Sequence, residues 1–238
     1  MLNLKNVWQG FKLPELWRSI LFFVIMGSFI PSFSTFMYYY ETDVLGISQI
    51  VISWLSVIGY FSLFLSVFMY QALLKEVDIR WMMFIGLLIN MFGCAFSIMF
   101  VKGYYLGMPP VVFLVMSSTV TDTLYSAYTQ LPGTVLFAKI IPESVESSMF
   151  ALLTGLINLS NLFAAPELGV FINTFVGVTS ENLQELWVLY CVQIGCCMIP
   201  MMFIWILPSR AAVALAQAKV NAEAEAFSET LRETLRLS

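Results

Sequence analysis

Histidine is absent from the 238 residues, and only 11% of the residues are charged. Without histidine, the chain lacks the commonest ligand for haem iron, zinc and copper and the usual proton carrier at neutral pH. It also contains no run of basic residues, and its formal net charge is −4, so a nucleic-acid partner is not expected. We therefore expect no cofactor, no metal site and no nucleic acid.

Familiar catalytic patterns are missing as well. The sequence contains no phosphate-binding glycine loop, no zinc-ligand spacing and no serine-hydrolase elbow. Its four cysteines, Cys94, Cys191, Cys196 and Cys197, lie in apolar runs without a Cys-x-x-Cys spacing, where a thiol behaves as a small hydrophobic group. We expect a protein that is not an enzyme.

Apolar side chains dominate what is present. They make up 60% of the chain, and the mean hydropathy is +0.86, far above the range of soluble globular domains. One crossing of a bilayer core of about 30 Å takes about 20 apolar residues. The sequence therefore predicts an all-α, polytopic membrane protein built as a six-helix transmembrane bundle, with membrane lipids as neighbours.

Polar turns divide the chain into these expected elements. An interfacial N-terminal arm covers residues 1–17, the transmembrane domain covers residues 18–208, and a helical tail covers residues 209–238. The predicted spans are residues 18–40, 50–74, 81–101, 111–139, 149–171 and 186–207. The tail carries an amphipathic stripe, which favours either weak packing on its own protein or docking onto a partner subunit. The stripe consists of Val213, Val220, Ala224, Phe227, Leu231 and Leu235.

The orientation in the membrane follows from the basic residues near the span ends. With six spans, one side receives Lys5, Lys12, Arg18, Lys75, Arg80, Lys139, Arg210, Lys219, Arg232 and Arg236. The other side receives only Lys102, together with the acidic residues Glu41, Asp43 and Glu181. Both termini are therefore expected on the cytoplasmic or equivalent face. The mitochondrial inner membrane and the plastid thylakoid are favoured, and the plasma membrane is also compatible.

The stretch VMSSTVTDTLYSAYTQLPG, residues 115–133, places an acid inside the fourth predicted span. Asp122 lies about 16 Å into a helix that begins at Val111, close to the bilayer midplane. A charge at that depth costs at least about 2.5 kcal/mol on insertion scales, so the side chain should face protein, water or a ligand. Pro132 predicts a bend just beyond this stretch.

Helical spacing places several polar residues on the Asp122 face, and the first span contributes a residue expected to face it. The candidate site residues are Asp122, Ser118, Thr119, Tyr125, Ser126, Thr129 and Tyr38. Two interpretations stay open. Asp122 either joins helices by hydrogen bonds to neighbouring hydroxyls, or lines a cavity as a substrate or proton-coupling site. Catalytic residues and metal ligands are not expected among them.

Four separated stretches resemble one known family. They are FMYYYETDVLGISQIVISWLSVIGY, SVFMYQALLKEVDIRWMMFIG, IPESVESSMFALLTGLINLSN and VGVTSENLQELW, in collinear order. Together they resemble the second half of the folate-biopterin transporter family, a branch of the major facilitator superfamily. The resemblance implies a six-helix half of a twelve-helix transporter, in which the first and fourth helices line the cavity and Asp122 matches a substrate or proton site.

Two functions are consistent with these observations. The first is an accessory subunit of a larger membrane complex, for instance an organellar energy-converting complex, that is derived from half of such a transporter. The alternative is a half-transporter that pairs with a second six-helix half and moves a pterin-like or other small organic solute. A carboxylate can accept two hydrogen bonds from a pterin, whereas the anionic tail of a folate would need a cation that this chain lacks at membrane depth.

Overall fold

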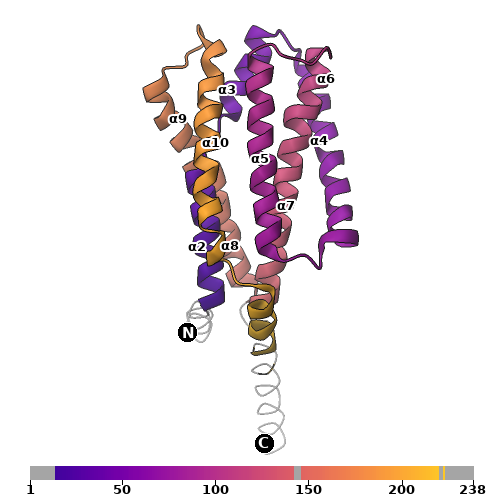
Figure 1. The fold of residues 1–238 in the computed structure, drawn as a ribbon, viewed down its shortest axis with the longest axis vertical. Coiled ribbons are helices and arrows are strands. Elements are labelled where there is room, and N and C mark those ends of the chain that lie inside the picture. The colour runs from indigo at the N-terminus through magenta and orange to yellow at the C-terminus, as the bar shows by residue number, and fades with distance from the viewer. Residues whose placement is uncertain (1–13, 142–145, 220–221, 223–238) are drawn as a thin grey trace, which may run out of the picture.

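The computed structural model describes residues 14–141, 146–219 and 222, apart from the side chains of Leu73 and Ser118. Within them every regular element is a helix (Figure 1). The α-helices are α2 (Pro14–Phe29), α3 (Ser34–Tyr39), α4 (Gln49–Met69), α5 (Ile79–Val101), α6 (Pro110–Leu114), α7 (Val120–Ile140), α8 (Glu146–Leu159), α9 (Ala165–Val176) and α10 (Leu186–Met202). A helical tail segment at 210–219 follows α10.

Shorter turns extend or join several of these helices. Wider π-helical turns form η1 (Tyr40–Val44), η2 (Tyr70–Leu74), η3 (Val115–Thr119) and η5 (Ser160–Ala164). Tighter 3₁₀ turns form η6 (Leu183–Glu185) and η7 (Ile204–Ile206). As a result, α6, η3 and α7 make one continuous helical stretch, and α8, η5 and α9 make another.

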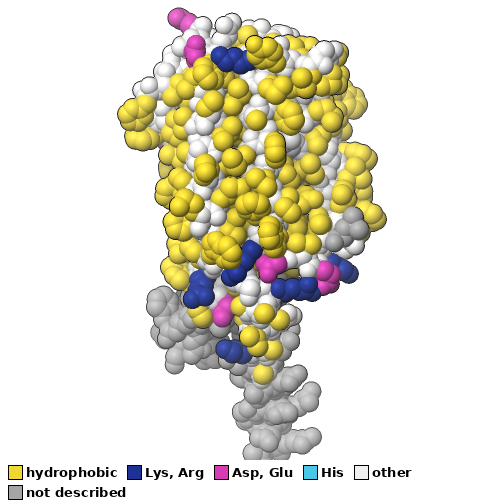
Figure 2. All heavy atoms as spheres, viewed as in Figure 1, with side chains coloured by type: hydrophobic (Ala, Val, Ile, Leu, Met, Phe, Trp, Pro, Cys, Tyr) yellow, Lys and Arg dark blue, Asp and Glu magenta, His cyan; other side chains and the backbone are white. Residues whose placement is uncertain are grey.

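Within the described residues, five helical stretches are long and apolar enough to cross a membrane: Pro14–Val44, Gln49–Ala72, Ile79–Val101, Glu146–Val176 and Leu183–Ile206. They match five of the six predicted spans and identify an integral membrane protein. Apolar side chains cover the flank of the bundle, and charged side chains gather toward its two ends (Figure 2). The remaining predicted span, the fourth in the chain, corresponds to Pro110–Ile140, which is more polar and packs against both α4 and α5.

Close packing of α5 on α7 depends on two glycines. A Cβ atom at Gly86 would lie 2.8 Å from the Thr129 Cγ2, and one at Gly93 would lie 2.9 Å from the Thr121 Oγ1. Such distances are shorter than real side chains tolerate, so only glycine fits here. Small residues that let helix backbones approach are the usual means of packing helices in membranes.

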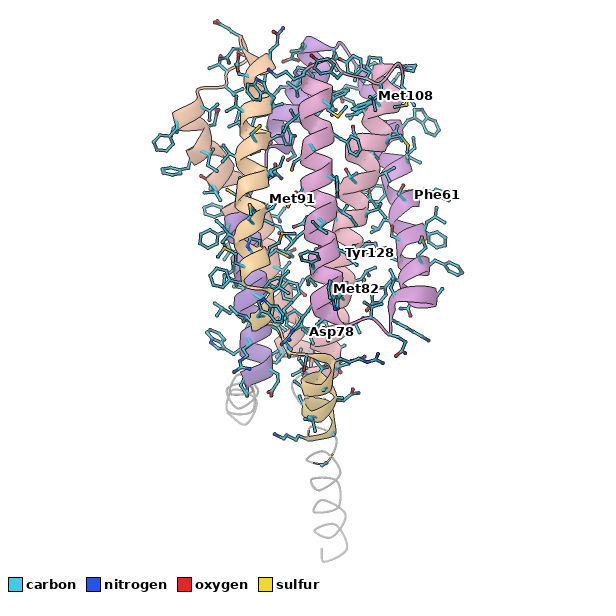
Figure 3. All side chains as sticks on the ribbon, viewed as in Figure 1. Phe61, Asp78, Met82, Met91, Met108 and Tyr128 are labelled. Carbon is cyan, nitrogen blue, oxygen red and sulfur yellow. The ribbon has the colours of Figure 1, made fainter. Side chains whose placement is uncertain are left out.

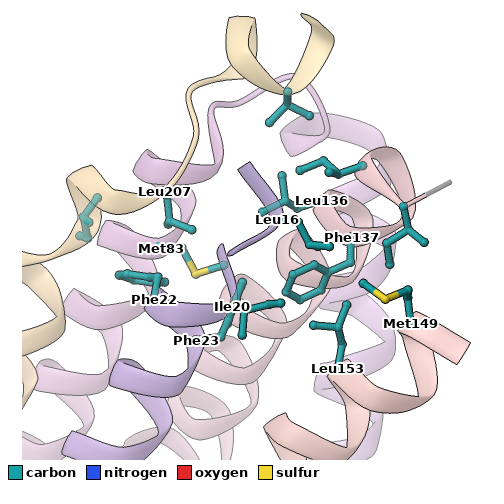
Figure 4. Close-up of a cluster of buried hydrophobic side chains, with 14 of the residues drawn as sticks. Leu16, Ile20, Phe22, Phe23, Met83, Leu136, Phe137, Met149, Leu153 and Leu207 are labelled. Atoms are coloured by element: carbon teal, nitrogen blue, oxygen red, sulfur yellow. The ribbon is translucent and has the colours of Figure 1, made fainter. Parts of the chain in front are cut away.

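Two apolar clusters hold the bundle together, one toward each end. The first joins α2, α5, α7, α8 and α10 near the chain termini, with Phe22, Met83 and Ile140 fully or almost fully buried (Figure 4). The second lies near the opposite end and contains Phe100 and Leu186, both fully buried. Polar residues are concentrated along the helices between these clusters.

A polar junction, which we call the helix-end junction, joins the α4–α5 loop to the end of α10 and the tail. Asp78, at the start of α5 (Figure 3), accepts hydrogen bonds from the backbone N–H of Arg80 at 2.9 Å and of Arg210 at 3.2 Å. The Arg80 guanidinium donates to the Leu207 carbonyl at 2.9 and 2.6 Å, and Arg210 forms an ion pair with Glu76. This junction ties three segments of the chain together at one end of the bundle.

Some details differ from the sequence predictions. Within the described residues, α2 already includes Pro14 to Trp17, which the sequence prediction assigned to the N-terminal arm. Helix α7 runs on through Pro132 to Ile140, and the irregular turn η3 precedes Asp122 instead of following it. In the tail stripe Val213 is buried against the first apolar cluster, whereas Val220, Ala224, Phe227, Leu231 and Leu235 lie outside the described residues.

Candidate functional site

A polar cavity of about 460 Å³ lies inside the bundle, between the two apolar clusters. Its walls come from α2, α3, η1, α5, α7 and α10, with η5 and the start of α9 closing one side. Its polar lining residues are Ser32, Ser34, Tyr38, Glu41, Asn90, Ser97, Asp122, Tyr125, Ser126, Gln130, Asn161, Tyr190 and Gln193. In a chain with so few charges, this cavity collects an unusual share of the polar side chains.

One wall of the cavity exists because the first membrane helix is interrupted. The stretch from Ile30 to Phe33 is not helical, and Pro31 within it cannot donate a backbone hydrogen bond. The Ser32 N–H instead donates to the Ala165 carbonyl at 3.0 Å, so the break is held by the start of α9. The interruption turns the hydroxyl groups of Ser32 and Ser34 toward the cavity, where their oxygen atoms are 3.2 Å apart.

Asp122, on α7, lines two hollows. It lines the cavity, and it also lines a second hollow of about 300 Å³ between α4 and α7, together with Ser56, Tyr60 and Thr123. Its side chain is exposed toward these spaces and, among the described residues, forms no hydrogen bond or ion pair. The position therefore leaves both carboxylate oxygens open to an incoming group.

The other predicted site residues divide into two groups. Tyr125, Ser126 and Tyr38 line the same cavity as Asp122, and the Tyr38 hydroxyl accepts a hydrogen bond from the Gln49 amide. Thr119 lies against Gly59 of α4 instead. Thr129 is 2% exposed, packs on Gly86 and donates its hydroxyl to the Tyr125 carbonyl at 2.7 Å. The Ser118 side chain lies outside the described residues.

Sequence reasoning missed Glu41. It placed this acid outside the membrane, beside Asp43, because the first span was expected to end at Tyr40. The helix in fact continues through the π-helical turn η1, and Glu41 lines the cavity while only 9% of it is exposed. Among the described residues, no hydrogen bond or ion pair reaches its carboxylate. Spacing gave one signal, because Glu41 follows Tyr38 by three residues and so shares its helix face.

Amide side chains complete the lining. The Asn90 Oδ1 accepts weak hydrogen bonds from the thiols of Cys94 at 3.4 Å and Cys197 at 3.6 Å. The Gln193 Oε1 is buried and has no hydrogen-bond partner within the part of the chain that the structure describes. Asn161 is exposed to the cavity. None of these three positions was among the predicted site residues.

The cavity is acidic. Glu41 and Asp122 both line it, and none of the described residues that line it is a lysine or an arginine. The cations that the structure describes lie elsewhere: Lys102 is 3.8 Å from the ring centre of Trp187, and Arg80 and Arg210 belong to the helix-end junction. The described residues also contain no group of three or more acidic, cysteine or histidine side chains able to hold a metal ion. The arrangement can therefore accept hydrogen bonds from a polar solute or bind a cationic one.

Comparison with known proteins assigns the chain to a family. The model of the BT1 family matches residues 2–226. The chain belongs to the BT1 family. This confirms the resemblance to folate-biopterin transporters that was drawn from four stretches of the sequence.

Individual relatives carry transporter names. The chain is 24% identical to probable folate-biopterin transporter 4 of Arabidopsis thaliana over 85% of its own length and 41% of that protein. It is 26% identical to folate transporter 1 of Plasmodium falciparum over 87% of its length and 41% of that protein. It is 24% identical to the folate-biopterin transporter of a Synechocystis strain over 87% of its length and 42% of that protein.

The extent of these matches matters for interpretation. The chain spans about two-fifths of the length of these relatives. No solved structure matches the chain. Their names describe transporters rather than enzymes, which is compatible with the absence of catalytic motifs in the sequence.

Proposed function

We propose that this BT1-family chain forms one half of a membrane transporter and provides one wall of a solute-binding cavity. The observation that carries the proposal is the polar cavity around Asp122 in an otherwise apolar bundle. A membrane-depth carboxylate without a bonded partner is expensive to keep, and in membrane proteins such groups mark substrate or ion pathways.

In this proposal the Pro110–Ile140 stretch is a sixth span. At 1.5 Å per residue it extends about 46 Å, enough to cross a core of about 30 Å. Part of its lower hydropathy comes from Asp122, Ser126 and Gln130, which line the cavity, because a helix wall exposed to a polar solute need not be apolar on every side. Both termini then lie on the cytoplasmic or equivalent face.

A second six-helix half would complete the site. In transporters with paired halves, rocking of one half against the other exposes a central site to each side of the membrane in turn. The alternative drawn from the sequence, a half-transporter for a pterin-like or other small organic solute, is supported by the names of the relatives. An accessory role in an energy-converting complex draws no support from them.

Asp122 is the proposed solute contact. A carboxylate accepts two parallel hydrogen bonds from a planar N–C–N group, such as the amino and ring N–H donors of a pterin. Tyr125 lines the same cavity and offers a ring on which a planar solute can stack. Tyr38, on α3, also lines the cavity.

Solute binding by the full chain tests this role. In equilibrium dialysis with radiolabelled biopterin, the wild-type chain in detergent is expected to bind, and Asp122→Asn to weaken binding about tenfold or more, since a hydrogen bond to a charged group is lost. Asp43→Asn is the matched control, because it removes the same charge outside the cavity. Binding that survives Asp122→Asn unchanged would contradict the assignment, and so would a wild-type chain that neither binds biopterin nor carries it across vesicle membranes.

A further inference from the structure

Glu41 has no role in the function proposed above, yet it is nine-tenths buried and directed into the cavity. Buried charges in proteins are usually paired, because removing an ion from water costs several kcal/mol unless a partner compensates. Within the described residues, Glu41 has no such partner. Its position is therefore explained better by a group that enters the cavity than by packing.

A second unpaired acceptor lines the same cavity. The Gln193 Oε1 is buried without a hydrogen-bond partner among the described residues, although more than nine in ten buried polar groups normally have one. Asp122 adds two more open acceptor atoms on the α7 wall. Glu41, Asp122 and the Gln193 Oε1 thus present open hydrogen-bond acceptors to this space, and two of these three residues are acids.

The rest of the lining indicates the shape and charge of a solute that would bind to these acceptors. Aromatic side chains from the interruption of the first membrane helix (Phe33), from α7 (Tyr125) and from α10 (Tyr190) line the cavity and suit a flat group. Among the described residues no lysine or arginine lines it, so this wall offers a negatively charged solute two carboxylates and no compensating cation. A flat cation instead gains charge-assisted hydrogen bonds from the acids and cation–π attraction from the rings.

We propose that Glu41 and Asp122 form a two-carboxylate recognition site for the planar, positively charged nitrogen head of an amidinium- or guanidinium-type solute. Each carboxylate accepts N–H donors along one edge of the head, and the Gln193 carbonyl oxygen accepts another donor. This inference rests on the proposed function in that it takes the cavity to be the solute site. It goes further by naming the charge that the site selects and a second residue that selects it.

A pair of probes with almost the same shape tests the charge selection. Benzamidinium and neutral benzamide differ mainly in charge and in one donor group. In equilibrium dialysis with the full chain in detergent, benzamidinium is expected to bind at least about tenfold more tightly than benzamide, and Glu41→Gln to remove most of that preference. Asp43→Asn, two residues away in the same turn but exposed, should leave the preference intact. Glu41→Asp keeps the charge and should retain much of it, which separates loss of recognition from misfolding.

The outcomes separate this inference from the proposed function. Equal binding of the two probes, or a preference that Glu41→Gln and Asp43→Asn change alike, overturns the charge-selective site. If biopterin binds through Asp122 while benzamidinium does not bind, the inference fails and the proposed function stands. If benzamidinium binds through Glu41 while biopterin neither binds nor is transported, the inference stands and the pterin-like solute is wrong.

Discussion

Acidic side chains in two regions of this molecule differ in what they contact. In the helix-end junction, Asp78 accepts two backbone hydrogen bonds and Glu76 is paired with Arg210. In the cavity, Glu41 and Asp122 line a polar space and, among the described residues, neither has a bonded partner. Bonded acids fasten segments of the fold, whereas unbonded acids at membrane depth are available to a ligand. Substitutions in the two regions should therefore have opposite effects on stability and on binding.

The largest loss of stability is expected from a substitution in the scaffold that shapes the cavity. Such a substitution leaves the acids of the cavity unchanged. A Cβ atom at Gly169 would lie 2.5 Å from the Ser32 carbonyl oxygen, where the first membrane helix is interrupted. Gly169→Ala must therefore displace backbone, and it is expected to cost about 1–3 kcal/mol of unfolding free energy. Thermal unfolding in detergent, followed by circular dichroism, measures this loss.

Gly155→Ala is the matched control for that substitution. Gly155 lies in α8, and a methyl group added there would meet no atom within 4 Å, so alanine should leave stability unchanged or raise it by up to about 1 kcal/mol. Equal melting temperatures for the two variants would show that α9 does not hold the interruption in place. The cavity wall formed by the interrupted first membrane helix would then not be held rigidly beside the unbonded acids.

Much of this scaffold could be predicted from the sequence, because apolar runs of about 20 residues separated by polar turns identify membrane helices directly. The sequence also grouped Asp122, Tyr125 and Ser126 on one helix face by their spacing of three and four residues, and these three residues line one cavity in the structure. These inferences depend on local chemistry alone.

Glu41 and Gln193 could not be found in the same way. Glu41 reaches the cavity because the helix extends through η1, and an aromatic belt followed by acids normally indicates the end of a span. Thr129 was expected on the polar face, but its placement depends on how closely Gly86 lets α5 approach α7. Both outcomes are set by contacts between helices far apart in the sequence.

An intermediate effect is expected from Asp78, the acid that begins α5. Asp78→Ala removes the acceptor for the backbone N–H of Arg80 and frees that of Arg210. Loss of such a helix cap typically costs about 1 kcal/mol. Thermal unfolding should show a lower melting temperature for this variant, with binding of biopterin unchanged at temperatures where the protein is folded. Asp43→Ala is the control, because its carboxylate accepts a hydrogen bond from the neighbouring Thr42 hydroxyl and so joins no distant segments.

Glu41 should behave in the opposite way. Glu41→Gln removes a buried carboxylate without breaking a bond that the structure describes, so the melting temperature of the ligand-free protein should stay the same or rise. Binding of a cationic probe should weaken at the same time. A drop in stability as large as that of Asp78→Ala would show that Glu41 fastens the fold, and the contrast between the two regions would disappear.

The smallest effect is expected where an acid is bonded but fully exposed. The Arg210 guanidinium beside Glu76 lowers the pKa of that carboxyl, chiefly through their hydrogen bond. Because the pKa is lower in the folded chain, the stabilisation is complete above the ordinary glutamate pKa of about 4.3 and is lost as the pH falls through the lowered value. Surface pairs contribute little and are screened by salt, so Glu76→Gln should barely change the melting temperature at neutral pH. Melting curves of wild type and Glu76→Gln at low salt should converge as the medium is acidified. A gap that persisted in acid or in high salt would mean that Glu76 acts through some contact other than its ion pair with Arg210.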